Sequence, residues 1–169
     1  MESRAKLAGH ALHPMLIVFP LGLLATAVIF DVAYRATGNA GFATVGFWNI
    51  AAGIIGGLLA AVFGLIDWLA VPSGTRAKAI GLWHGVGNVV VVALFGASWL
   101  IRWGDPAHLP ATVPLILEVV AVVLALVTGW LGGELVERLG VGVDEGAHLD
   151  APNSLSGQPA TVGGRASRA

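Results

Sequence analysis

The chain has 169 residues, of which 56% are hydrophobic and 11% are charged, and its mean hydropathy is +0.82. Soluble domains carry about 25% charged residues, so this composition is that of a membrane protein. A formal net charge of −1, with no basic patch, argues against nucleic acid as a partner. The absence of cysteine excludes disulfides, iron–sulfur clusters, thiolate metal sites and cysteine nucleophiles.

Four long apolar stretches are expected to be transmembrane helices, at residues 10–34, 47–71, 80–103 and 113–135. Each has roughly 20 to 25 residues, which is enough to cross a bilayer with a modest tilt. The first stretch follows Arg4 and Lys6, but it is too long for the apolar core of a signal peptide, carries two prolines and lacks a clear cleavage site. We therefore interpret it as a span.

The connections between the stretches are short and contain glycine or proline, so consecutive helices should be antiparallel neighbours. The sequence thus predicts an all-α fold, a four-transmembrane-helix up-down bundle that occupies residues 1–149. From residue 150 to residue 169 the chain is polar and rich in Gly, Ser, Ala and Pro, which predicts a disordered cytoplasmic tail.

Lysine and arginine near the membrane set the orientation of such a bundle. One side of the predicted bundle carries Arg4, Lys6, Arg76, Lys78 and Arg138. The other side carries only Arg35 and Arg102. Both termini are therefore expected on the cytoplasmic side.

Three of the four spans have one polar residue near each end. The pairs are His13 with Asp31, Asn49 with Asp67, and His84 with Arg102. Each pair is 18 residues apart, which corresponds to about five helical turns and roughly 27 Å of rise, so both members lie on one face of their helix. We expect two polar layers, one at each membrane face, separated by an apolar middle.

The inner, cytoplasmic layer draws titratable and amide side chains from all four helices. Its members are His10, His13, Asp67, His84, Asn88 and Glu134. The first and third helices are diagonal in the predicted bundle, so His13 and His84, with Asn88 one turn deeper, are positioned to hold haem b between two imidazoles. Asp67 and Glu134 would then orient the imidazoles or carry protons to a quinone. This favours a redox-associated membrane subunit with a membrane redox partner.

Two other interpretations of the inner layer remain open. A divalent metal could be bound or transported by His10, His13, Asp67, His84 and Glu134, because imidazole and carboxylate ligands suit Zn, Mn or Fe(II), although no local metal motif such as HExxH is present. Alternatively, the polar layers only fix helix register in a non-catalytic assembly subunit or homo-oligomer. The sequence offers no nucleophile–base pair, so an enzyme acting on its own is not expected.

The outer layer should contain Asp31, Asn49, Arg102 and Glu118. An ion pair of Asp31 with Arg102 or with Arg35 is expected there, and we interpret it as structural. Glu118 and Glu134 are 16 residues apart, which places them on nearly opposite faces of the fourth helix. One of the two glutamates should therefore face a neighbouring helix or the headgroups.

Several segments resemble one family, and each contributes a short motif. The segments are His10-Ala11-Leu12-His13-Pro14, Phe19-Pro20-Leu21-Gly22-Leu23, and the stretch from Gly129-Trp130-Leu131-Gly132-Gly133-Glu134 to Gly140-Val141-Gly142-Val143. With Asp31, Asp67 and His84, they resemble the membrane protein family catalogued as domain of unknown function 2231, over roughly residues 7 to 150. The resemblance implies a four-span protein of the bacterial inner membrane without a settled biochemical role.

The resemblance also bears on electron transfer. Some members of that family carry the domain beside a Rieske-type iron–sulfur domain, which would suit a redox association, but this chain has no cysteine. Members often read Tyr-x-His-Gly-Val-Gly-Val after the glutamate of the fourth helix, whereas this chain has Leu139 in place of that histidine. If the histidine is a ligand elsewhere in the family, this chain lacks it.

Overall fold

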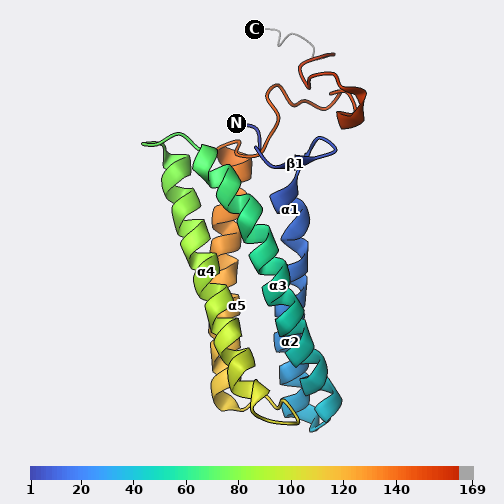
Figure 1. Cartoon of the computed structure of the whole chain (residues 1–169), viewed down its shortest axis with the longest axis vertical. Helices are drawn as coiled ribbons and strands as arrows, with labels where there is room; N and C mark the ends of the chain where they lie inside the picture. The colour runs from blue at the N-terminus through green and yellow to red at the C-terminus, as the bar shows by residue number, and fades with distance from the viewer. Residues whose placement is uncertain (164–169) are drawn as a thin grey trace.

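The computed structural model describes residues 1–163, and its long helices run up and down in one bundle (Figure 1). The long elements are α1 (Leu12–Leu16) with α2 (Val18–Thr37), α3 (Ala40–Ala70), α4 (Arg76–Trp103), and α5 (Thr112–Gly133) with its π-helical extension η1 (Glu134–Arg138). Two short antiparallel strands, β1 (Lys6–Leu7) and β2 (His10–Ala11), precede α1, and the 3₁₀-helix η2 (Ser154–Ser156) follows the bundle.

Four helical segments are long and apolar enough to cross a membrane, with mean hydropathies of 1.7 to 2.3 in their most apolar windows. Large apolar side chains cover the outside of the bundle; Leu100 and Leu126, for example, are 67% and 70% exposed. Such a surface is stable against lipid chains rather than water, while the helices satisfy their own backbone hydrogen bonds. The all-α transmembrane bundle that the sequence predicts is therefore confirmed.

The connection between α2 and α3 is a tight turn that moves one predicted boundary. Gly38 ends α2 in the left-handed conformation, with φ of 71°, and the side chain of Asn39 caps α3 by accepting a hydrogen bond from the Gly41 N–H at 3.0 Å. Helix α3 therefore begins at Ala40, well before the predicted residue 47. The capping chemistry, rather than the first strongly apolar residue, sets the boundary.

The first span is interrupted, and its start differs from the prediction. His10 lies in strand β2 instead of the helix, and α1 begins at Leu12. Pro20 has no N–H, so it cannot donate to the carbonyl four residues earlier, and the chain breaks at Ile17 between α1 and α2. The two segments nevertheless act as one apolar span, Leu12–Thr37.

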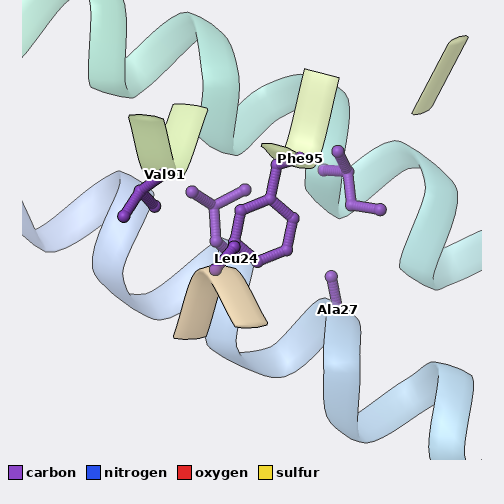
Figure 2. Packing of buried hydrophobic residues seen from close by; sticks show 6 residues of the cluster. Leu24, Ala27, Val91 and Phe95 are labelled. Atoms are coloured by element: carbon purple, nitrogen blue, oxygen red, sulfur yellow. The ribbon is translucent and has the colours of Figure 1, made fainter. Parts of the chain in front are cut away.

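Two helical hairpins, α1/α2 with α3 and α4 with α5, meet along a seam whose middle is apolar. Figure 2 shows Leu24 and Ala27 of α2 facing Val91 and Phe95 of α4. Ile50 of α3 and Ala121 of α5 complete this buried cluster. Close packing of this kind holds helices together in lipid, where apolar burial alone gives no preference for protein neighbours.

The N-terminus and the described residues that follow α5 lie at the same end of the bundle, which we call the terminal end (Figure 1). The opposite end, formed by the α2–α3 turn and the connection 104–111, is called the loop end. Residues 150–163, part of the predicted disordered tail, form turns and η2 but no α-helix. The rest of that prediction, residues 164–169, lies outside the described residues.

Candidate functional site

The two imidazoles that the sequence singled out meet at the terminal end of the seam. His13 of α1 and His84 of α4 have ring centroids 6.3 Å apart, and their planes are nearly perpendicular at 84°. Both residues are half-buried. The fold therefore brings together the pair of histidines on which the haem hypothesis depends.

Each imidazole is oriented by the second helix of its own hairpin. Nδ1 of His13 lies 2.8 Å from the Ala60 carbonyl of α3, and Nδ1 of His84 lies 2.8 Å from the Thr128 carbonyl of α5. A carbonyl only accepts, so each Nδ1 carries a proton and donates it, and each Nε2 is the nitrogen left for a ligand or a further proton.

Glycine makes room for both rings. A Cβ on Gly64 of α3 would come within 2.9 Å of Cε1 and Nδ1 of His13, and a Cβ on Gly132 of α5 would come within 3.1 Å of Cε1 of His84. Any larger residue at these positions would push the imidazole away from its carbonyl partner. The two histidines thus occupy matching niches in the two hairpins.

Asn88 lies one helical turn from His84 on α4, toward the apolar middle of the bundle, and contacts that histidine. Its side-chain amide donates to the His84 carbonyl at 2.8 Å and lies 3.3 Å from Nε2 of the same histidine. Its carbonyl oxygen accepts a hydrogen bond from the Thr128 hydroxyl at 3.1 Å. His84, Asn88 and Thr128 therefore form one network between α4 and α5, in which the sequence had indicated the first two residues.

Asp67, the carboxylate predicted to face the histidines, instead holds the N-terminal segment. Its Oδ1 accepts from the backbone N–H groups of Arg4 at 2.7 Å and Ala5 at 3.3 Å. The Ser3 hydroxyl lies 2.9 and 2.8 Å from its two oxygens. The hydrogen-bonding capacity of this carboxylate is therefore used to fold residues 3–5 over the terminal end.

The remaining members of the predicted inner layer also have other surroundings. Glu134 accepts a hydrogen bond from Nη2 of Arg76 at 2.6 Å, and His10 is exposed on strand β2. Among residues 1–163, no three His, Asp or Glu side chains are grouped so that they could hold a metal ion. The structure thus brings together His13, His84 and Asn88, but not the five-residue ligand set proposed for a divalent metal.

The loop end of the seam holds a fully buried ion cluster around Arg102. Its guanidinium binds Asp31 in a bidentate manner, with Nη1–Oδ2 and Nη2–Oδ1 distances of 2.6 and 3.0 Å. It also donates to the carbonyls of Ala43 and His108 and to Oε1 of Glu118. All five N–H groups of the guanidinium are thereby satisfied. The predicted Asp31 pair is with Arg102, while Arg35 is exposed.

Glu118 is the inward-facing glutamate of α5, and it joins this cluster as a third charged group. Its Oε1 accepts from the Ser98 hydroxyl at 2.5 Å and from Arg102 at 3.1 Å, whereas its Oε2 is buried without a partner among residues 1–163. Asn49, also expected in this layer, lies apart from the cluster and donates to the Thr26 hydroxyl at 3.2 Å. Sequence reasoning placed Glu118 near this end of the membrane but gave it no role.

The two polar sites share one spacing along the chain. His13 and His84, like Asp31 and Arg102, are 71 residues apart, and each pair joins one hairpin to the other. Because His13 and Asp31, like His84 and Arg102, are 18 residues apart on one face of their span, one pair meets at each end of the seam.

Comparison with known proteins agrees with this architecture. A family model described as a predicted membrane protein, DUF2231, matches residues 9–145. No curated protein and no solved structure matches the chain. Because the match spans all four helices and both polar sites, the chain belongs to the DUF2231 family of predicted membrane proteins.

Proposed function

We propose that this protein is a redox-associated membrane subunit that holds haem b between His13 and His84. The observation that carries the proposal is the imidazole pair itself, in which each Nδ1 donates to a carbonyl, so that Nε2 is the unprotonated nitrogen of each ring, with the Asn88 amide 3.3 Å from that of His84. Metal-bound histidines have this pattern, because the second-nitrogen hydrogen bond fixes the tautomer and the ring orientation.

The convergence of the two rings supports the same proposal. His13 and His84 come from different hairpins, their ring centroids lie 6.3 Å apart, and both residues are half-buried at the seam. They would hold the haem iron as imidazole ligands, and the haem would supply one-electron redox chemistry. Electrons would pass to a membrane redox partner or to a second copy of the chain.

The absorption spectrum of the protein purified from a haem-replete host tests this proposal. We expect a Soret band that is lost in His13→Ala and in His84→Ala and is kept in His10→Ala, whose exposed imidazole is the matched control. A colourless wild-type protein would rule out haem b.

A second candidate is a single divalent ion that His13 and His84 bind through Nε2 without a macrocycle. Elemental analysis of the colourless protein would then find one metal per chain, absent from His13→Ala and His84→Ala. If neither haem nor metal is found, the histidines serve to fix helix register, and the protein is the assembly subunit of the third interpretation.

We further propose that the terminal end faces the cytoplasm across a bacterial inner membrane. Arg102 is buried against Asp31 and does not contribute a surface charge, so the loop end exposes Arg35. At the terminal end Arg4, Arg76 and Arg138 are exposed, and Lys6 and Lys78 are half-buried. The excess of exposed Lys and Arg at the terminal end is therefore larger than a count of these residues in the sequence indicates.

The chain has no cysteine, so single cysteines report orientation cleanly. We expect Ala107→Cys to react with an impermeant maleimide in intact cells and Ser156→Cys to react only after lysis. The reverse pattern would invert the proposed topology.

A further inference from the structure

The ion cluster at the loop end contains an uneven number of charges. Asp31, Arg102 and Glu118 have side chains that are 0% exposed, and only one of the three is a cation. If both carboxyl groups were ionised, the cluster would keep one net negative charge in a dry part of the bundle. An uncompensated buried charge is far more costly than a buried neutral hydroxyl that lacks a partner.

The hydrogen bonds identify the carboxyl group that is less well supported as an anion. Both oxygens of Asp31 accept from Arg102, which is the arrangement of an ionised carboxylate. Glu118 accepts two hydrogen bonds, both through Oε1, and its Oε2 has no partner. The asymmetry matches a neutral carboxyl group, whose Oε1 is the acceptor and whose Oε2 carries hydrogen.

We infer that Glu118 is a proton-binding site and that the resting cluster is a neutral arrangement of Asp31⁻, Arg102⁺ and protonated Glu118. This site is independent of the imidazole pair at the other end of the seam. The ten residues that separate Asn88 from Ser98 along α4 correspond to about 15 Å, and this interval holds the apolar cluster of Val91 and Phe95.

A proton fits this cluster better than a metal cation. The Arg102 guanidinium lies 3.1 Å from Oε1 of Glu118 and would repel a second cation. The packing is also tight, because a Cβ on Gly46 of α3 would collide with Oδ1 of Asp31. A proton requires no additional space.

Among residues 1–163, the charged groups in the cluster around Glu118 are Asp31 and Arg102. Asp31 comes from α2, Ser98 and Arg102 come from α4, and α3 contributes the Ala43 carbonyl. His108, in the connection before α5, gives its carbonyl to Arg102 while its ring stacks on Phe47 at 3.9 Å. The charge balance therefore depends on which of the two carboxyl groups binds a proton, and the hydrogen bonds favour Glu118.

Infrared spectroscopy of the full chain in lipid nanodiscs tests the inference without relying on a variant. We expect the C=O stretching band of a protonated carboxyl group at neutral pH. This band should move when the protein is labelled with ¹³C-glutamate and stay in place with ¹³C-aspartate. Absence of the band would overturn the proposal, and a band that responds to ¹³C-aspartate would move the proton to Asp31 and overturn it as well.

Two variants assign the band to one residue. Glu118→Gln, which keeps the shape and neutrality of the protonated side chain, should fold and lose the band. Glu134→Gln is the control, because Glu134 lies on the same span as Glu118 but pairs with Arg76, and this variant should keep the band. Retention of the band in folded Glu118→Gln would contradict the assignment.

Discussion

Asp31 and Arg102 form a bidentate ion pair in the interior of the bundle near its loop end, although 71 residues separate them in the chain. One belongs to each hairpin, and both side chains are fully buried. The pair therefore joins the two hairpins at the loop end of the seam.

Removing one partner of this pair should destabilise the bundle. Asp31→Asn is expected to lower the free energy of unfolding by roughly 1–3 kcal/mol, because it breaks the bidentate pair while Glu118, which also contacts Arg102, can ionise in place of Asp31. The measurement is denaturant unfolding in micelles followed by circular dichroism. Arg35→Met, at an exposed arginine near the same end, is the control and should change stability little. A double variant, Asp31→Leu with Arg102→Met, should be less destabilised than Asp31→Leu alone; a larger loss would contradict the argument.

A second prediction concerns the packing of the His13 ring against Gly64 at the terminal end. Gly64→Ala should displace His13 from the Ala60 carbonyl and destabilise the protein by about 1–3 kcal/mol, because the new Cβ overlaps the ring. Gly133→Ala is the matched control, since a Cβ there has no neighbour within 4 Å. It should be neutral or stabilising by up to about 1 kcal/mol. Thermal unfolding compares the variants, and ¹⁵N NMR of the histidine side chains follows the Nδ1 proton. Equal behaviour of the two variants would exclude a packed niche.

The helices could be predicted from the sequence because each one carries its own signal. A span of apolar residues is long enough to be recognised without any knowledge of its partners, and the Gly38-Asn39 turn and the Thr75 cap lie between such spans. The start of α3 was placed too late because its first residues, from Ala40, are small and weakly apolar. His10 was placed in a helix because pairing of two-residue strands leaves almost no pattern in the sequence.

The sequence alone did not predict which residues the site side chains contact, because these contacts depend on how neighbouring helices align along their length. Ser98 and Glu118 lie ten residues before and ten residues after His108, and Asn88 and Thr128 lie twenty residues on either side of it. Folding α4 and α5 about this connection therefore aligns both pairs, a signal that could have identified the role of Glu118. Asp67 lies at the terminal end and binds Ser3, a contact that depends on how the N-terminal segment folds back and that the sequence pattern of α3 does not show.

Asp67 should control the order of the N-terminal segment rather than the imidazole pair. In Asp67→Ala, the amides of Arg4 and Ala5 lose their acceptor, so residues 1–9 should exchange hydrogen for deuterium much faster. Hydrogen-exchange mass spectrometry provides the measurement. Ser3→Ala, which removes the hydroxyl but leaves both backbone donors bound, should have a smaller effect. Unchanged exchange in Asp67→Ala would show that other contacts hold the segment.

The connection between α4 and α5 should respond to acid through Asp105. Hydrogen bonds from the N–H groups of Ala107 and Leu109 lower the pKa of Asp105 from its ordinary value of 3.8. A carboxylate whose pKa is lower in the folded state stabilises the fold above its unfolded pKa, and this contribution is lost as the pH falls through the lowered value. Acidification below pH 3.8 should therefore release the amides of Ala107 and Leu109, and NMR should record their shifts changing together. Asp105→Asn, which keeps an acceptor oxygen but cannot ionise, should abolish this transition. A midpoint at or above 3.8 in the wild type would show that these two N–H groups do not stabilise the ionised form.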